Sequence, residues 1–471
     1  MSRTAISPIH TIQDELKALF DDRITLNPGV CNNHGRGEGP MASLPPDAVV
    51  FPITTTEVSV LAKLCNKARV PIIPFGVGTS LEGHVAAPQG GVCVDFAQMN
   101  NVLAVNTNDM DAVVQPGVTR KQLNSYIRDT GLFFPVDPGA DASIGGMTAT
   151  RASGTSTVRY GSMKDNVIAL EVVMADGSII KTASRARKSA AGYDLTHLMI
   201  GSEGTLGIIT EITVKLHGIP EAVVAAACPF PTIDKAVKCV ITAIQMGIPM
   251  ARMELLDETS MAAVNAYSKL DYTVAPTLFL EFEGSPNSVK EQVETLINIA
   301  QDLGANDFQW ADKPEDRSRL WAARHDMYYA GLAYRPGSES LTTDVCVPIS
   351  NLAQSIHQTH NTLAASSITG LILGHVGDGN YHTLLLFDPN DPEQNTEAQR
   401  INKTIVEQAL ALDGTCTGEH GVGMGKRHYL KQELGKGAVA MMTNIKQSLD
   451  PNNILNPEKI ISLNEMGKDQ R

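Results

Sequence analysis

The sequence lacks the features of a membrane-spanning, disulfide-bonded or nucleic-acid-binding protein. No segment approaches the run of about 18 apolar residues that a spanning helix needs. The seven cysteines are odd in number and form no CxxC pair, which indicates a reduced compartment without a disulfide framework. Acidic residues outnumber basic ones, 51 to 38, and the formal net charge is −13. This charge argues against nucleic acid as a partner, and an anionic substrate must be attracted by local positive charge.

Three signatures of common enzyme classes are also missing. The sequence contains no GxGxxG, which argues against the dinucleotide fingerprint of a nicotinamide enzyme. It contains no GxxxxGK[ST], the phosphate loop of nucleotide hydrolases, and no GxSxG nucleophile elbow. If the chain is an enzyme, its chemistry therefore depends on other motifs.

The N-terminal residues do not resemble a targeting segment. Acidic residues come early, at Asp14, Glu15, Asp21 and Asp22, whereas a signal peptide has an apolar core and a transit peptide is rich in arginine and poor in acid. We therefore expect a cytoplasmic protein, and a peripheral position at the membrane stays open.

What is present is enough chain for two or three domains, since 471 residues exceed one hydrophobic core. Short β-branched runs alternate with helical periods between Pro45 and Pro220, which predicts an α+β first domain over residues 1–220, made of two α+β subdomains. Residues 221–415 alternate helices and strands in a pattern that predicts one antiparallel sheet covered by helices. Residues 416–471 form a third, C-terminal segment that begins with a glycine-rich loop.

Two glycine-rich segments of the first domain are candidates for cofactor binding. PFGVGTSLEGH (74–84) follows a strand-like run, and its glycines and hydroxyl groups suit a pyrophosphate, although a lone loop of this kind is more often an ordinary turn. VDPGADASIGGMTATRASGTSTVRYG (136–161) contains five glycines and few large apolar groups. Such a stretch cannot build a core, and a disordered loop of this length between periodic strands is improbable. It favours a backbone that wraps a large flat ligand.

Two further glycine-rich loops carry the residue types of a metal site. GHVGDGNYH (374–382) places His375 and His382 on either side of a turn-forming GDGN, so a hairpin-like reversal could bring both imidazoles together. CTGEHGVGMGK (416–426) presents Glu419 and His420. Two histidines and one carboxylate are a recurring three-ligand set, although each histidine alone is more often structural. Because adjacent residues in an extended loop cannot easily bind one ion, we assign Glu419 to the metal and His420 to the general base.

One arginine on a predicted helix points toward the interior. In RSRLWAARHDMYYAGLA (317–333), Arg324 lies on the same face as Leu320, Trp321 and Met327. An inward guanidinium needs an anionic partner. That partner is either a structural carboxylate such as Asp344 or the carboxylate of a substrate, held as a bidentate pair.

These motifs together resemble a known family. PFGVGTSLEGH, PVDPGADASIGGM, LEVVMADG and LMIGSEGTLGIIT are similar to the flavin-binding fold of the vanillyl-alcohol oxidase (VAO) / p-cresol methylhydroxylase (PCMH) superfamily. GHVGDGNYH, LTTDVCVPIS, GTCTGEHGVGMGKR and LDPNNILNP resemble its D-lactate dehydrogenase (cytochrome) branch, close to D-2-hydroxyglutarate dehydrogenases and the flavin subunit of glycolate oxidase. The resemblance covers residues 45–460, and its long motifs occur in the same order.

The resemblance implies an FAD cofactor, a divalent metal (Zn²⁺ or Mn²⁺, with Fe²⁺ as the third candidate) and the roles of individual residues. The pyrophosphate would lie on residues 76–80 and the flavin ring along 138–154, and the C-terminal segment would return to the FAD domain. His375, His382 and Glu419 would be the metal ligands, His420 the base, Arg324 the carboxylate clamp, and Asn380 would border the substrate. The residues expected to contact FAD are Pro74, Gly76, Gly78, Thr79, Ser80, Gly83, Pro138, Asp141, Ser143, Gly145, Gly146, Thr150, Ser153, Gly154, Tyr160, Glu203, Gly204 and Ile208. His84 matches no site of covalent flavin attachment, so we expect dissociable FAD.

One departure from the family pattern bears on the substrate. The hydroxyglutarate enzymes carry a lysine two residues before the Asp of this motif, where it meets the distal carboxylate, and this chain has Thr342 there. A neutral hydroxyl cannot compensate a second buried carboxylate. A small monocarboxylate such as D-lactate is therefore the expected substrate.

The expected reaction is oxidation of a D-2-hydroxy acid, with electrons passed to a cytochrome, a quinone or an electron-transfer flavoprotein. Three alternatives stay open: another 2-hydroxy acid such as glycolate or a longer one, a flavin subunit that works only inside an iron–sulfur complex, and a flavin-free metal hydrolase. A homodimer is a further expectation that the sequence does not decide.

Overall fold

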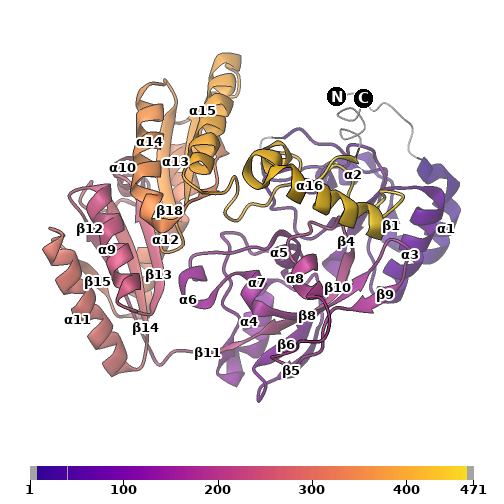
Figure 1. The fold of residues 1–471 in the computed structure, drawn as a ribbon, viewed down its shortest axis with the longest axis horizontal. Helices are drawn as coiled ribbons and strands as arrows, with labels where there is room; N and C mark the ends of the chain where they lie inside the picture. The colour runs from indigo at the N-terminus through magenta and orange to yellow at the C-terminus, as the bar shows by residue number, and fades with distance from the viewer. Residues whose placement is uncertain (1–7, 40, 464–471) are drawn as a thin grey trace. The chain divides into compact units, whose positions relative to one another are not determined.

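The structure is a computed structural model that describes residues 8–39 and 41–463, and the chain forms two compact units (Figure 1). Unit 1 comprises the chain up to Ser153, Ser162–Gly218 and the segment from Glu419 onward. Unit 2 comprises Gly154–Gly161 and Ile219–Gly418. Each unit has its own sheets and its own core.

Unit 1 begins with a four-stranded sheet in the order β1-β2-β4-β3, in which β2, β4 and β3 run parallel. The hydrophobic period of 56–69 forms helix α3, and it buries Val58, Leu61, Ala62 and Cys65 as predicted. Thr54 caps this helix by accepting a hydrogen bond from the backbone N–H of Glu57. The elements of this part are α1 (Gln13–Phe20), β1 (Ile24–Thr25), α2 (Pro28–His34), β2 (Ala48–Val50), α3 (Thr55–Ala68), β3 (Ile72–Phe75) and β4 (Val92–Asp95).

A second, five-stranded sheet of unit 1 is antiparallel, in the order β5-β6-β10-β8-β9. Its strands coincide with the β-branched runs of the sequence, and their inward side chains build a separate core with the flanking helices. The elements are β5 (Val102–Asn106), β6 (Asp111–Val114), α4 (Arg120–Ile127), β7 (Leu132–Phe133), α5 (Ile144–Thr150), α7 (Met163–Asn166), β8 (Val167–Val173), β9 (Ile179–Lys181), α8 (Leu195–Met199), β10 (Ile208–Lys215) and β11 (His217–Gly218).

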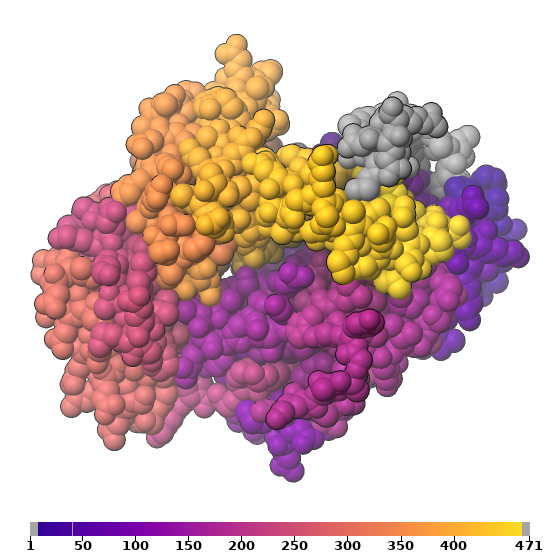
Figure 2. All heavy atoms as spheres, in the orientation of Figure 1, coloured from indigo at the N-terminus to yellow at the C-terminus, as the bar shows by residue number. Residues whose placement is uncertain are grey.

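The C-terminal segment completes unit 1. Helix α16 (Leu430–Leu449) is kinked at Gly435 (φ 80°), and its partly buried Ile445 and Leu449 pack on the core of the five-stranded sheet. The buried ammonium of Lys446 donates to Asp450 (2.6 Å) and to the backbone oxygens of Thr205 (2.8 Å) and Leu455. Figure 2 shows this segment in yellow against the magenta and indigo parts of the same unit.

Unit 2 contains one eight-stranded sheet in which every pair is antiparallel, as predicted. Leu256, Phe279 and Leu384 are among the side chains that build its core with the helices on one face, and α9, α11 and α14 lie in front of the sheet in Figure 1. The elements are α6 (Thr157–Tyr160), β12 (Ala222–Pro229), α9 (Ile233–Gln245), β13 (Met250–Leu256), α10 (Glu258–Ser268), β14 (Thr277–Gly284), α11 (Pro286–Asp302), β15 (Gln309–Ala311), α12 (Pro314–His325), α13 (Met327–Tyr334), β16 (Glu339–Thr342), β17 (Val345–Cys346), α14 (Leu352–Ala364), β18 (Thr369–His375), β19 (Asn380–Phe387) and α15 (Pro392–Ala411).

The helix predicted over 317–333 is two helices. Asp326 separates α12 from α13, with dihedral angles (φ −79°, ψ 3°) that leave the helical region. Aspartate is a poor interior helix residue because its short polar side chain competes for backbone groups. The break ends α12 one residue after Arg324, at His325.

The structure bears on two features that the sequence lacks, namely disulfide pairs and membrane-spanning helices. All seven cysteines are thiols that form no disulfide, six of them buried. Among the residues that the structure describes, no helix is long and apolar enough to cross a membrane.

Candidate active site

The hairpin of β18 and β19 in unit 2 brings His375 and His382 together. The GDGN tetrad makes the predicted reversal, in which Asp378 N donates to His375 O (3.0 Å) and Gly379 takes a positive φ of 77°. His375 ends β18, and His382 is the third residue of β19. Their ring centroids lie 5.4 Å apart, and both side chains are buried.

Each of these imidazoles is fixed at Nδ1 by an oxygen that can only accept. His375 Nδ1 lies 2.6 Å from Glu254 Oε1, and His382 Nδ1 lies 3.1 Å from the backbone oxygen of Thr343. Both Nδ1 atoms must therefore carry a hydrogen. This arrangement directs the Nε2 atom of each ring, the usual second coordination position of an imidazole, away from these acceptors, which suits a pair of ligands for a divalent cation.

Arg324 pairs with Glu254 and not with Asp344, the structural partner considered from the sequence. Its Nε and Nη2 atoms lie 2.9 and 2.7 Å from Glu254 Oε2. Only two of the five N–H groups of this guanidinium, on Nε and Nη2, contact Glu254, so its Nη1 atom can bind another anion. Sequence reasoning missed Glu254, although a charged residue inside the apolar run of β13 is a signal that could have found it.

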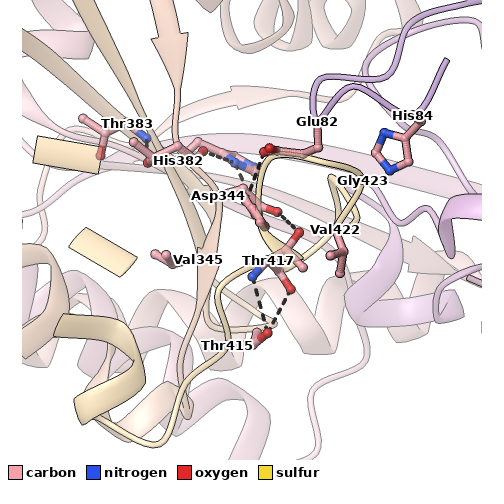
Figure 3. Close-up of polar contacts among 12 residues, drawn as sticks. Glu82, His84, Asp344, Val345, His382, Thr383, Thr415, Thr417, Val422 and Gly423 are labelled. Carbon is pink, nitrogen blue, oxygen red and sulfur yellow. Dashed lines mark hydrogen bonds and ion pairs between the residues drawn. The ribbon is translucent and has the colours of Figure 1, made fainter. Parts of the chain in front are cut away.

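Asp344 belongs to a second buried network of unit 2, around Asn380. The amide Nδ2 of Asn380 donates to Asp344 Oδ1 (2.9 Å) and to Val345 O (2.8 Å). Thr417 donates from its hydroxyl to Asp344 Oδ2 (2.8 Å), and Figure 3 shows these groups beside His382, whose Nδ1 is 3.7 Å from Asp344 Oδ1. Within the described residues the buried Oδ1 of Asn380 accepts no hydrogen bond, so this oxygen is available to a ligand hydroxyl.

In unit 1 the two predicted glycine loops touch. A Cβ added to Gly76 would lie 2.4 Å from Ser143 Oγ, and one added to Gly204 (φ 70°) would lie 2.8 Å from the ring of Pro74. Ser143 caps α5 by accepting from Gly146 N (3.3 Å). These five predicted cofactor residues thus lie on adjacent backbone segments, which pack too closely for a side chain at Gly76 or Gly204.

The other predicted FAD residues are distributed over both units. Gly154 and Tyr160 belong to unit 2, and the Tyr160 hydroxyl donates to Glu283 Oε2 (2.5 Å). Burial, with that carboxylate beside it, raises the pKa of Tyr160. The side chain of Ile208 is packed in the core of the four-stranded sheet. The remaining ones lie in unit 1: Gly78, Thr79, Ser80, Gly83, Pro138, Asp141, Gly145, Thr150, Ser153 and Glu203.

Glu203 holds the loop that carries Glu419 and His420. Its oxygens accept hydrogen bonds from the backbone N–H groups of Val422 (2.7 Å) and Gly423 (2.8 Å), and its own backbone adopts φ 53°. His84 Nε2 lies 3.2 Å from the same carboxylate. Burial alone would lower the pKa of His84, but the charge and hydrogen bond of Glu203 outweigh it and raise that pKa. Figure 3 labels His84, Val422 and Gly423.

Glycine is required at two positions of this loop. A Cβ on Gly421 (φ 80°) would lie 2.7 Å from His84 Nε2, and one on Gly423 (φ 49°) would lie 2.1 Å from the backbone oxygen of Glu82. Met424 N also donates to that oxygen (2.8 Å). The hydroxyl of Ser153, from the glycine-rich segment 136–161, donates to Glu419 Oε2 of this loop (2.7 Å).

Comparisons with known proteins identify the family. Residues 46–183 match a model described as FAD binding domain, and residues 219–460 match one described as FAD linked oxidases, C-terminal domain. The chain belongs to the FAD-linked oxidases. This match confirms the predicted flavoprotein family and supports FAD as the cofactor.

Individual relatives agree with this assignment. The chain of this FAD-linked oxidase is 52% identical to "Probable D-lactate dehydrogenase, mitochondrial" from Danio rerio, over 96% of this chain and 91% of the relative. It is 49% identical to "D-lactate dehydrogenase [cytochrome], mitochondrial" from Arabidopsis thaliana, over 95% and 79%. A solved structure of p-cresol methylhydroxylase with substrate bound matches with a TM-score of 0.82 at 19% identity, over 97% and 98%, which confirms the predicted PCMH/VAO-type fold.

Proposed function

We propose that this FAD-linked oxidase oxidises a small D-2-hydroxy acid, in the first place D-lactate, with the help of a divalent cation. The cation would be held by His375, His382 and Glu419. When bound, FAD accepts the hydride from the substrate carbon, and the cation polarises the substrate oxygens.

The observation that carries the cation is the orientation of the two imidazoles. Both Nδ1 atoms of His375 and His382 are fixed by acceptors, so both rings offer Nε2 as a ligand. Chain continuity supports the third ligand, since Glu419 comes two residues after Thr417, whose hydroxyl donates to Asp344 beside His382. Two residues span about 7 Å at most. N/N/O ligands suit Zn²⁺, Mn²⁺ or Fe²⁺ alike.

The remaining residues bind the substrate and move its proton. Arg324, through the Nη1 end of its guanidinium, would fix the substrate carboxylate, and the Oδ1 of Asn380 would accept from the substrate hydroxyl. His420 would remove the hydroxyl proton, because imidazole has the near-neutral pKa that a general base needs. With FAD bound as the hydride acceptor and His420 as the proton acceptor, the hydroxy acid would become a 2-oxo acid.

FAD would lie along the glycine loops of unit 1. The touching loops at Gly76, Ser143 and Gly204 support this placement, because backbone N–H groups at glycines can approach a pyrophosphate closely. The match to an FAD binding domain removes the flavin-free hydrolase from the alternatives.

The choice of a monocarboxylate depends on Thr342, which ends β16 opposite Leu384 and offers no positive charge. The D-lactate names of the relatives favour the same choice, and glycolate or a longer 2-hydroxy acid is the second candidate. The word cytochrome in the name of the Arabidopsis relative puts a cytochrome before a quinone or an electron-transfer flavoprotein as the acceptor. The cytoplasmic location remains a prediction, and the mitochondrial location printed for both relatives is the competing one.

The test is anaerobic bleaching of the flavin in the purified holoprotein. We expect D-lactate to bleach the visible absorbance of the flavin, and L-lactate, glycolate and D-2-hydroxyglutarate to do so more slowly or not at all. Removal of the metal with a chelator should abolish bleaching, and Mn²⁺ or Zn²⁺ should restore it. Unchanged bleaching in metal-free protein would disprove the role of the cation, and a colourless protein would disprove the flavin chemistry.

A further inference from the structure

We propose that Glu254 is a positioning residue that sets two parts of the site with one carboxylate, the ligand His375 and the clamp Arg324. The inference rests on the proposed function. It adds a residue that neither the sequence motifs nor the comparisons assign.

The geometry of Glu254 divides its two oxygens between two functional side chains. Oε1 faces His375 Nδ1 at 2.6 Å, and Oε2 receives Arg324 Nε at 2.9 Å and Nη2 at 2.7 Å. The side chain of Glu254 is fully buried, and both partners are at least nine-tenths buried. All three residues belong to unit 2, and β13 and β18 pair so that Glu254 lies opposite His375.

The burial of this carboxylate makes its position rigid. An ionised carboxylate away from water is tolerated only with charged or hydrogen-bonded partners on its oxygens, and Glu254 has both kinds. If either partner rotated away, an oxygen would lose its compensation. The imidazole of His375 is therefore held in one ring orientation and one tautomer, with Nε2 directed away from Glu254.

The same contact also orients the guanidinium. With Nε and Nη2 attached to Glu254, the plane of the Arg324 group is fixed, and Nη1 becomes the end that is left for a substrate carboxylate. The carboxylate thus couples cation binding to substrate binding, because one group holds both His375 and Arg324.

The neighbouring strand provides a matched control. Glu281 on β14 is also buried, and it accepts from Trp321 Nε1 (2.7 Å) and lies 3.4 Å from Arg252 Nη1. Glu281 is therefore a buried carboxylate of the same sheet with an aromatic donor and an arginine as partners, and neither of these is a proposed metal ligand. A purely structural role of such carboxylates would affect Glu254 and Glu281 variants alike.

The first experiment compares Glu254→Gln with Glu281→Gln as holoproteins. We expect Glu254→Gln to bind Mn²⁺ about 10- to 100-fold more weakly in competition with a chelator, the effect usual for loss of an outer partner of a ligating histidine. Its KM for D-lactate should rise as well, while its FAD content stays at the wild-type level. Glu281→Gln should change the Mn²⁺ affinity less than about threefold, because that carboxylate does not orient a ligand. Equal Mn²⁺ affinities in the two variants would overturn the proposal.

The second experiment reads the histidine directly and requires neither metal nor activity. In ¹⁵N-histidine-labelled, metal-free protein, His375 should be present as the Nδ1–H tautomer in the wild type, with its signals assigned by their loss in His375→Gln. In Glu254→Gln the signals should shift toward a tautomer mixture, and in Glu281→Gln they should not. A wild-type His375 that carries its hydrogen on Nε2 would overturn the proposal even if Glu254→Gln failed to fold.

Failure of the proposed function would look different. If wild-type protein bound no Mn²⁺ or Zn²⁺ at all, the cation would be disproved, while the tautomer of His375 would still test whether Glu254 positions the ring. Glu254→Asp adds a graded case, because a shorter carboxylate cannot reach both partners. We expect its Mn²⁺ affinity to lie between those of the wild type and Glu254→Gln.

Discussion

The two units hold their functional groups in different ways. In unit 2, side chains hold side chains: Glu254 fixes His375 and Arg324, and Asp344 accepts from Asn380 and Thr417. In unit 1, the backbone provides the framework. Glu203 accepts hydrogen bonds from the main-chain N–H groups of a loop. The glycines of this loop lie so close to neighbouring atoms that a Cβ would not fit.

This difference suggests which substitutions matter in each unit. A site built on side-chain charge should respond to loss of a carboxylate or a histidine, whereas a site built on backbone approach should respond to the addition of a methyl group. The division also matches the two proposed imidazole ligands of unit 2 and the proposed pyrophosphate site of unit 1, since a cation needs lone pairs on side chains and a pyrophosphate needs backbone donors.

The largest effect is expected at His420, the side chain of the unit 1 loop to which we assign the proton transfer. His420→Ala should lower turnover with D-lactate by about 10²- to 10⁴-fold, the usual contribution of a general base. FAD and metal contents should stay normal, because the loop backbone is held by the hydrogen bonds of Val422 N and Gly423 N to Glu203. Steady-state dye reduction and the flavin absorbance measure both quantities. Turnover within threefold of the wild type would show that His420 is not the base.

A smaller but clear effect is expected from a methyl group in the same loop. Gly423→Ala combines a positive φ with a Cβ 2.1 Å from Glu82 O, and we expect the free energy of unfolding to fall by about 2 kcal/mol or more. Gly139→Ala is the control, since a Cβ there meets nothing within 4 Å. Denaturant midpoints at unchanged m-value give the comparison. Equal midpoints for the two variants would mean that the backbone of this loop is not as constrained as the contacts indicate.

The smallest effect is a pH dependence in unit 2, at the buried Asp257 that caps α10. Burial raises the pKa of Asp257 to about 6, against the lowering effect of its hydrogen bonds with Ser260. The unfolded value is about 3.9. Below about pH 4 the carboxyl is protonated in both states, and its burial then costs no charge. The free energy of unfolding falls as the pH rises from about 4 through about 6, because the unfolded state ionises more readily than the folded state.

Asp257→Asn should remove this loss, since asparagine caps a helix as well as aspartate. We expect the variant to exceed the wild type in unfolding free energy by about 1 kcal/mol at pH 8 and to lose that advantage at pH 4, measured by urea unfolding across the range. Asp391 caps α15 at the surface, and its pKa is lowered, chiefly by hydrogen bonds from Gln394. Asp391→Asn should therefore give no gain at pH 8. If Asp391→Asn raised the free energy of unfolding at pH 8 as much as Asp257→Asn does, burial of the carboxylate would not be the cause of the gain.

The sequence predicts best what is encoded locally. The GDGN turn predicts the reversal that brings His375 and His382 together, and the β-branched runs predict the strands of both units, because turn chemistry and periodicity act over a few residues. The family match and the PCMH/VAO-type fold follow from motifs that are continuous in the chain.

The partners of the functional residues could not be predicted because they are distant in sequence. Glu254 is 70 residues from Arg324 and 121 from His375, and Glu203 is 219 residues from Val422. Such pairs depend on which strands become neighbours and in what register, which a single sequence does not reveal. For the same reason Asp344 was a plausible partner of Arg324, although its oxygens accept from Asn380 and Thr417 instead.

The short stretch Gly154–Gly161 has a consequence for protein engineering. It belongs to unit 2 although unit 1 precedes and follows it, and α6 within it contacts β13 while Tyr160 bonds Glu283. The polypeptide therefore passes from one unit to the other four times. A fragment ending at Gly218 would carry an orphaned piece of unit 2 and would lack the final part of unit 1. Exchange of unit 2 between relatives would thus require transplanting two separate gene segments, the small one included.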